Sequence, residues 1–96
     1  MNHDMIKIAV ADDETIILSG LQKVIKRLGS GFQICGEAQN GRTLLKLIET
    51  EQPDIIITDI CMPDLTGIEV LKHTSKMEKP PRVILISGYQ DFEYAR

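Results

Sequence analysis

The stretch PDIIITDICMP, residues 53–63, decides the fold of this 96-residue chain. Its three successive isoleucines make it the most hydrophobic strand candidate of the chain. Pro53 precedes the run and Asp59 closes it, so the expected strand Asp54–Asp59 carries a carboxylate at its carboxyl end. The segment therefore predicts a strand that ends in an acid.

Three other segments have the pattern of a strand. Met5–Ala11 is mostly apolar and β-branched, which is typical of a strand buried on both faces, and an acidic pair ends it abruptly. Phe32–Ala38 alternates apolar and polar residues in part, which predicts a strand with one less buried face. Arg82–Ser87 is again rich in branched apolar residues and stops at Gly88. We therefore expect strands at four places along the chain.

Helical patterns fill the intervals between the first three strands. Apolar residues from Ile17 to Leu28 recur every three or four positions, the spacing of an amphipathic helix, and Gly29 is a stop signal. Asn40 is placed to cap a second helix, which Pro53 terminates. Each of these strands is therefore followed by a helix before the next strand begins.

The alternation continues to the end of the chain. Thr66 and Glu69 have the spacing of a capping box at the start of a third helix, which should run to about Met77 and stop before Pro80. Asp91 is a candidate cap for a fourth helix. Strands that alternate with helices predict an α/β fold with a doubly wound parallel sheet and helices on both faces.

In such sheets, ligands bind beyond the carboxyl ends of the strands. The residues at those ends are Asp12, Asp13, Asp59 and Ser87. Carboxylates that lie so close together repel one another unless a cation binds between them. Mg²⁺ takes carboxylate oxygens and phosphate oxygens together, so the pattern favours a magnesium site. The alternative is that Asp12 and Asp13 simply cap the first helix.

Asp59 has a further possible role, because a carboxylate can attack phosphorus and form an aspartyl phosphate. A cation bound to both groups removes most of the repulsion between the two anions. Ser87 follows the neighbouring strand and could donate a hydrogen bond to the new phosphoryl oxygens.

Composition limits the other classes of function. Hydrophobic residues make up 43% and charged residues 26% of the chain, as in an ordinary globular domain, and the length allows a single domain spanning residues 1–96. The net charge of −3 argues against a nucleic-acid-binding surface within these residues. The sequence has no membrane-spanning run or signal peptide, so we expect a cytoplasmic protein without a membrane partner. Cys35 and Cys61 are expected to be reduced and buried.

The chain resembles the receiver domain of two-component response regulators, which has a flavodoxin-like fold. The matching stretches are Val10–Glu14, residues 53–63 with Gly67 shortly after, and the strand that closes at Ser87. The resemblance implies the strand order 2-1-3-4. It also implies that residues 1–96 are a receiver domain incomplete at its C-terminal end, lacking a fifth strand and a fifth helix.

The resemblance also implies roles for single residues. Asp59 would be the phosphoacceptor, and Ser87 the hydroxyl residue that senses the phosphoryl group. Asp13 would ligate Mg²⁺ directly and Asp12 largely through water, with the backbone carbonyl of Cys61 as a further ligand. Such a module is not an enzyme beyond its own phosphorylation and dephosphorylation.

The implied partners are a sensor histidine kinase and, only through an output domain outside these residues, DNA. Residues 87–95 further resemble regulators with an AraC-type output domain, whose function is transcriptional control. Without a fifth strand, Val83–Ile86 would be an open edge, so we expect residues 1–96 alone to be unstable or to form a homodimer.

Two other functions stay open on the sequence alone. One is a Mg²⁺-dependent phosphatase or nuclease of the carboxylate-cluster type. The other is a receiver-like docking module that is never phosphorylated, which the absence of the family's lysine would support. Magnesium affinity discriminates the docking module, because an intact acidic pocket should bind the ion.

Overall fold

Residues 5–87 are described in this computed structural model, and in them strands and helices alternate along the chain. The strands are β1 (Ile6–Ala11), β2 (Phe32–Ala38), β3 (Ile55–Asp59) and β4 (Arg82–Ile86). The helices are α1 (Thr15–Arg27), α2 (Gly41–Glu51) and α3 (Gly67–Thr74). All strand pairs are parallel and the order is β2-β1-β3-β4, which confirms the predicted α/β class and the order 2-1-3-4.

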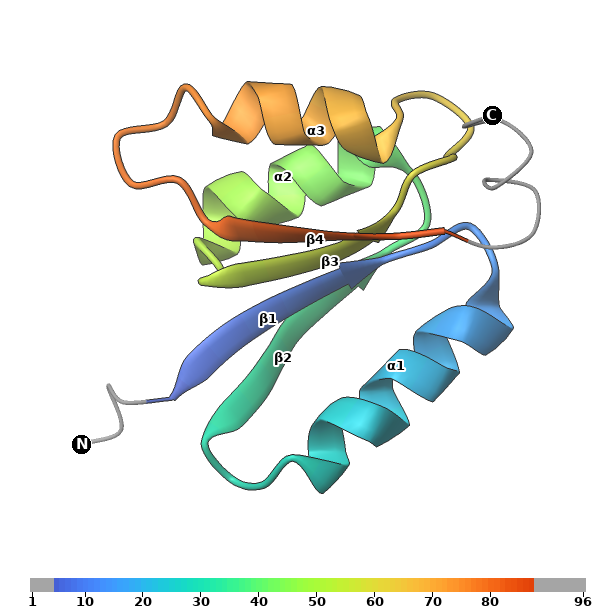
Figure 1. Cartoon of the computed structure of the whole chain (residues 1–96), viewed down its shortest axis with the longest axis vertical. Helices are drawn as coiled ribbons and strands as arrows, with labels where there is room; N and C mark the ends of the chain where they lie inside the picture. Colours follow the sequence, from blue (N-terminus) through green and yellow to red (C-terminus); the bar gives the residue numbers. More distant parts are fainter. Residues whose placement is uncertain (1–4, 88–96) are drawn as a thin grey trace.

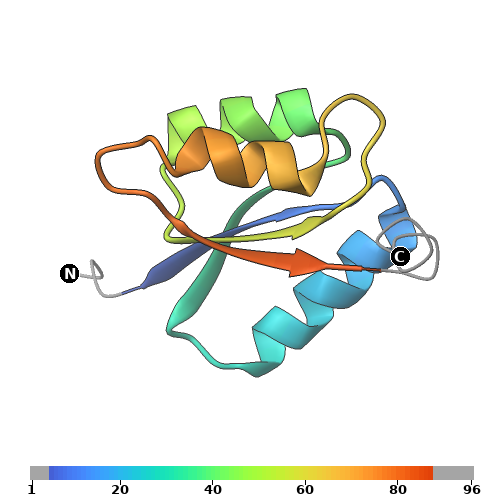
Figure 2. The ribbon, with the colours of Figure 1, turned by 45° about the horizontal axis from the view of Figure 1, so that its top comes forward.

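The sheet lies between two layers of helices. Helices α2 and α3 cover one face and α1 covers the other, as Figures 1 and 2 show from two directions. Strand β1 alternates between the layers: Ile8 and Val10 belong to the core beside α1, whereas Ala9 and Ala11 belong to the core beside α2 and α3. The sheet is therefore doubly wound, as predicted.

The helix starts follow the predicted capping residues. The side chain of Asn40 accepts a hydrogen bond from the Thr43 amide, 2.8 Å away, at the start of α2. Thr66 and Glu69 form the reciprocal capping box at the start of α3. Gly29 follows the end of α1 with a φ of 115°, a conformation that glycine adopts without steric cost.

Two details differ from the expectations. Helix α3 ends at Thr74 and not near Met77, because the hydroxyls of Thr74 and Ser75 donate to the Leu71 and Lys72 carbonyls and compete with helical hydrogen bonding. Cys35 and Cys61 are free, as expected, but they are half-buried and not buried.

Strand β4 ends at Ile86, and Gly88 and the helix expected from Asp91 lie outside the described residues.

The pairing of β1 with β2 contains an irregularity, since Ile8 pairs with Ile34 but Ala9 pairs with Gly36. Cys35 is therefore an extra residue in β2, as in a β-bulge.

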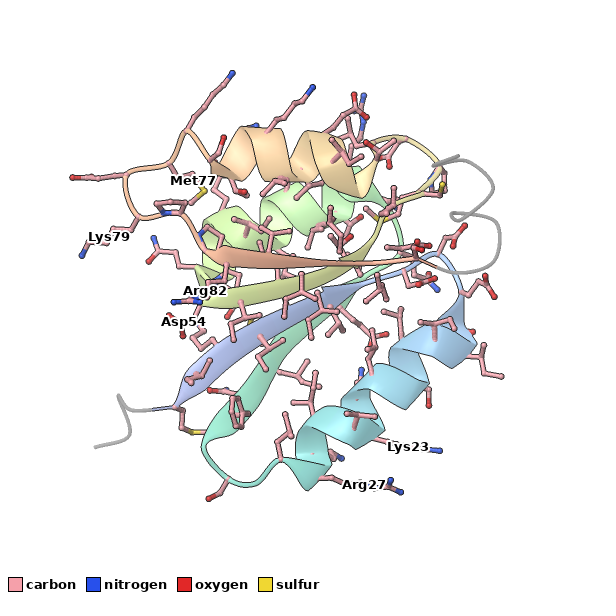
Figure 3. The ribbon with its side chains drawn as sticks, viewed as in Figure 1. Lys23, Arg27, Asp54, Met77, Lys79 and Arg82 are labelled. Atoms are coloured by element: carbon pink, nitrogen blue, oxygen red, sulfur yellow. The ribbon has the colours of Figure 1, made fainter. Side chains whose placement is uncertain are left out.

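The basic side chains of Lys23 and Arg27 lie on the exposed surface of α1, away from the sheet (Figure 3).

Candidate functional site

The predicted site residues emerge at the same end of the sheet. Ala11 pairs with Thr58, so the next residues, Asp12 and Asp59, leave neighbouring strands about 4.8 Å apart. Asp59 pairs with Ile86, and Ser87 follows Ile86 directly at an exposed position. The loops that leave β1 and β3 lie together at this end in Figure 1. The strand order thus brings Asp12, Asp59 and Ser87 to one edge.

An acidic group follows β1. Carboxylate oxygens of Asp12, Asp13 and Glu14 all lie within 4.8 Å of one another. Asp12 is only 4% exposed, whereas Asp13 and Glu14 are exposed. Glu14 was not among the predicted ligands, although its place in the same acidic run was a signal for it. Among the described residues this trio is the carboxylate group that could hold a metal ion, and Asp59 lies on the adjoining strand.

The carboxyl group of Asp12 is electrostatically unfavourable in its ionised form. Burial raises the pKa of Asp12 most, and the negative charges of Asp13 and Glu14 raise it further. The Glu14 amide, 2.9 Å from Asp12 Oδ1, opposes this shift by donating a hydrogen bond. A divalent cation would relieve both the desolvation and the repulsion.

Simple helix capping does not account for the acidic pair. The residue that caps α1 is Glu14, and its side chain makes no capping hydrogen bond. Asp12 instead accepts from the amide of Glu14 itself, so its carboxylate is held at the strand end and not over the first helical turn. The geometry favours the cluster over the capping alternative.

Asp59 is held at the end of β3 with 8% of its surface exposed. The Cys61 amide donates to Asp59 Oδ1 over 3.3 Å, and the Thr58 hydroxyl donates to the Asp59 carbonyl over 3.1 Å. The side chain of Thr58 also contacts the Met62 sulfur at 3.8 Å. These contacts orient the carboxylate and the first residues of the loop that follows it.

Gly67 fixes the far end of that loop. Its amide donates to the Ile60 carbonyl over 2.7 Å, and a Cβ at position 67 would lie 2.5 Å from the carbonyl oxygen of Asp59. The Ile60 amide in turn donates to the Ile86 carbonyl over 3.2 Å. The segment behind Asp59 is therefore closed tightly against β4, and only glycine fits at position 67 without displacement.

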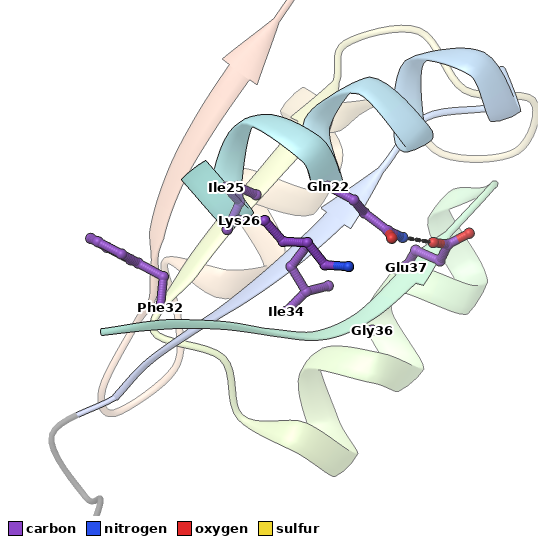
Figure 4. Close-up of a pocket in the computed structure, with 7 residues that line it drawn as sticks. All are labelled: Gln22, Ile25, Lys26, Phe32, Ile34, Gly36 and Glu37. Carbon is purple, nitrogen blue, oxygen red and sulfur yellow. Dashed lines mark hydrogen bonds between the residues drawn. The ribbon is translucent and has the colours of Figure 1, made fainter. Parts of the chain in front are cut away.

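A groove of about 430 Å³ between α1 and β2 is separate from this site (Figure 4). A hydrogen bond from Gln22 to Glu37 crosses it, and Lys26 lies along it. Its lining includes Ile25, Phe32 and Ile34 but none of the predicted site residues. Within residues 5–87, no helix has the length and apolar character needed to cross a membrane.

The family model of the response regulator receiver domain matches residues 8–96. The chain therefore belongs to the response regulator receiver domain family.

Curated relatives of the chain include transcriptional regulatory proteins. The chain is 41% identical over 92 residues to the uncharacterized transcriptional regulatory protein YesN of Bacillus subtilis, covering 96% of this chain and 25% of that protein. It is 37% identical over 92 residues to the transcriptional regulatory protein HptR of Staphylococcus aureus, covering 96% of this chain and 36% of that one. The chain thus spans only about a quarter to a third of the length of these relatives.

Solved structures with the same fold include a DNA-binding response regulator of the LuxR family from Staphylococcus aureus. The TM-score is 0.82 at 31% identity, covering 95% of this chain and 75% of that one. The receiver domain of AraT, a response regulator from Geobacillus stearothermophilus, gives a TM-score of 0.81 at 32% identity, covering 95% and 70%. These matches support the flavodoxin-like fold of the receiver family.

Proposed function

We propose that this chain is the phosphorylated switch of a two-component response regulator, with Asp59 as the acceptor of a phosphoryl group from a sensor histidine kinase. One observation carries the proposal: the buried residue Asp59 ends β3, and the neighbouring strand β1 is followed at the same end of the sheet by Asp12, the first of the clustered acidic residues. An aspartate held between an acidic cluster and a hydroxyl residue has the chemistry of a phosphoacceptor.

In the transfer, a carboxylate oxygen of Asp59 forms the new bond to phosphorus as the bond between phosphorus and the kinase's histidine nitrogen breaks. The electron pair of the broken bond stays on the imidazole, and no water takes part. The Cys61 amide, already 3.3 Å from Asp59 Oδ1, holds the carboxylate in orientation. Ser87, at the end of the neighbouring strand, donates its hydroxyl proton in a hydrogen bond to the transferred group.

Oxygen donors at this edge fit Mg²⁺. The proposed ligands are Asp13 directly, Asp12 largely through water, Asp59, and the backbone carbonyl of Cys61. The fit rests on the carboxylates of Asp12, Asp13 and Glu14, which lie within 4.8 Å of one another, on the place of Asp59 at the end of the adjoining strand, and on the raised pKa of Asp12, which burial and its negative neighbours cause. When bound, Mg²⁺ supplies the positive charge that offsets repulsion between the carboxylate and the phosphoryl oxygens.

The proposed output is control of transcription through a DNA-binding domain elsewhere in the protein. The relatives named as transcriptional regulatory proteins support this, as does the solved DNA-binding response regulator. Receiver domains of such regulators are generally not enzymes, which disfavours a phosphatase or nuclease; the chain's only chemistry would be its own phosphorylation and dephosphorylation. The AraC-type output stays a prediction, because residues 88–95 lie outside the described residues.

Asp59→Asn tests the acceptor. Incubation of the intact protein with a small phosphodonor and Mg²⁺ should give base-labile phosphate in the wild type and at least about 100-fold less in the variant, because an amide oxygen does not attack phosphorus. Asp54→Asn, just before the opposite end of β3, is the matched control and should retain labelling. Equal labelling of Asp59→Asn and the wild type would remove Asp59 from this role.

A further inference from the structure

A chain of hydrogen bonds joins the end of β1 to the loop after β3 by way of α2. The Asp12 amide donates to the Ala38 carbonyl over 3.0 Å and so fixes the end of β2 beside the acidic group. Helix α2 begins shortly after Ala38, and the amides of Gly41 and Arg42 donate to the Asp64 carboxylate over 2.7 and 3.0 Å. Asp64 therefore connects the first turn of α2 to the loop that starts at Asp59.

The Asp64 carboxylate is fully engaged at this junction. Oδ1 also accepts from the Leu65 amide over 2.7 Å, and the guanidinium Nε of Arg42 lies 4.0 Å from Oδ2. Although burial alone would raise it, hydrogen bonds from the Arg42, Gly41 and Leu65 amides hold the pKa of Asp64 below its usual value. The carboxylate is thus ionised at neutral pH.

The first residue of α2, Gly41, packs closely against the loop residues Asp64 and Leu65. A Cβ at position 41 would lie 2.4 Å from Leu65 Cβ and 3.2 Å from Asp64 Oδ1, so the first residue of α2 must be glycine for the loop to reach it. This closeness shows that the contact between Asp64 and α2 is part of a packed interface.

Asp64 lies three residues after Cys61, in the loop that holds the proposed magnesium ligand. Cys61 is oriented by its amide's hydrogen bond to Asp59, and Met62 is buried in the core beside α2 and α3. Asp64 provides a third attachment, to a helix on the far side of the loop. Without it, the part of the loop between Met62 and Gly67 would lose its attachment to α2, and the loop would hold the Cys61 carbonyl less firmly.

We propose that Asp64 is a positioning residue for the magnesium site: by binding the first turn of α2, it fixes the loop that presents the Cys61 carbonyl beside Asp59. The inference rests on the proposed function, because it assumes that the site binds Mg²⁺. In this proposal Asp64 itself contacts neither the ion nor the phosphoryl group.

The test is Mg²⁺ titration of the intact protein by calorimetry, with hydrogen exchange of the Cys61 amide measured without metal. Asp64→Ala should raise the Kd for Mg²⁺ about 10-fold, as is typical when a group that orients a ligand is lost. It should also speed exchange at Cys61. Asn40→Ala is the matched control: it removes a cap from the same end of α2, so it should lower Tm, but it should leave both readouts unchanged.

Asp64→Asn keeps one acceptor oxygen and guards against a failure of Asp64→Ala to fold. It should raise the Kd about 3-fold, between the wild type and Asp64→Ala. A wild-type Kd in both Asp64 variants overturns the positioning role and leaves the proposed function standing. Equal weakening by Asn40→Ala also overturns it, since general loosening of α2 would then explain the effect. Failure of the wild type to bind Mg²⁺ overturns the proposed function, and the inference with it.

Discussion

The two ends of the sheet handle charge in opposite ways. At the amino end, Lys7 lies 3.7 Å from the Glu51 carboxylate, and the Lys7 amide donates to Asp54 Oδ2 over 2.8 Å. Asp54 directly precedes β3, and Arg82 is the first residue of the neighbouring strand β4 (Figure 3). At the carboxyl end, Asp12, Asp13 and Glu14 crowd together, and within residues 5–87 no basic side chain forms an ion pair with them.

The difference separates charges that stabilise the fold from charges that oppose it. Acids at the amino end are matched by a lysine and by backbone amides, so they contribute to stability. Acids at the carboxyl end repel one another, and one of them is buried. A ligand that offsets this cost is the usual reason for such an arrangement, and this supports the proposal that the carboxyl end holds the functional site.

Gly67→Ala should have the largest effect on stability, and the effect should arise at the carboxyl end of the sheet, where Gly67 packs against Asp59. The added Cβ would lie 2.5 Å from the Asp59 carbonyl oxygen, so the loop or the helix must move, at a cost of about 1–3 kcal/mol in the free energy of unfolding. Gly20→Ala in α1 is the matched control. Nothing lies within 4 Å of its Cβ, and alanine's helix propensity should stabilise by up to about 1 kcal/mol. Urea denaturation of both variants checks the opposite signs; the same sign in both would refute the close contact.

Asp12→Asn should stabilise the metal-free protein at pH 7, raising Tm by roughly 2–4 °C, because it removes a buried negative charge beside two others. Magnesium should reverse the order of the two melting temperatures, so that the wild type becomes the more stable protein. At ten times its Kd the ion stabilises the wild type by about 1.4 kcal/mol, and the variant gains less. Thermal melting with a chelator and with Mg²⁺ measures both differences.

The pH dependence of that difference has a defined sign. Burial and negative neighbours raise the pKa of Asp12 in the folded state, so its ionisation costs stability as pH rises through the folded pKa. The advantage of Asp12→Asn in chelator should therefore shrink as pH falls from 7 through the raised pKa, and vanish near pH 4, where the unfolded carboxyl is also protonated. A constant advantage across this range would contradict the electrostatic origin.

Asp54→Asn should have the smallest effect and the opposite sign. The same change from acid to amide weakens the hydrogen bond that Asp54 accepts from the Lys7 amide, lowering the free energy of unfolding by about 0.5 kcal/mol. It should leave Mg²⁺ affinity unchanged, because it lies at the far end of β3. Chemical denaturation and calorimetry on this variant test whether the two ends are independent, and stabilisation would contradict the comparison.

The sequence predicted most of the fold because its signals are local. The run Ile55 to Ile57 and the caps at Asn40 and Thr66 each depend on neighbours within a few residues. The predicted end of α3, near Met77, was wrong because local sequence signals do not report side-chain hydrogen bonds to the backbone. No periodicity reports that the hydroxyls of Thr74 and Ser75 take carbonyls of the preceding turn.

The site was predicted less completely. Asp12, Asp13, Asp59 and Ser87 could be identified because each follows a strand-like run, although their roles came from the resemblance and stay proposals. Asp64 could not be singled out, since its partners in α2 lie 22 and 23 residues earlier in the chain. Only the folded topology brings those amides to it.

The extra residue in β2 makes the two borders of the sheet unequal. An irregular hydrogen-bonding pattern at Cys35 interrupts the row of amides and carbonyls that another strand would need for continuous pairing. Strand β4, by contrast, keeps an unbroken register with β3 from Arg82 to Ile86. Sheet extension, within one molecule or between two, should therefore proceed from β4, while β2 discourages indiscriminate aggregation.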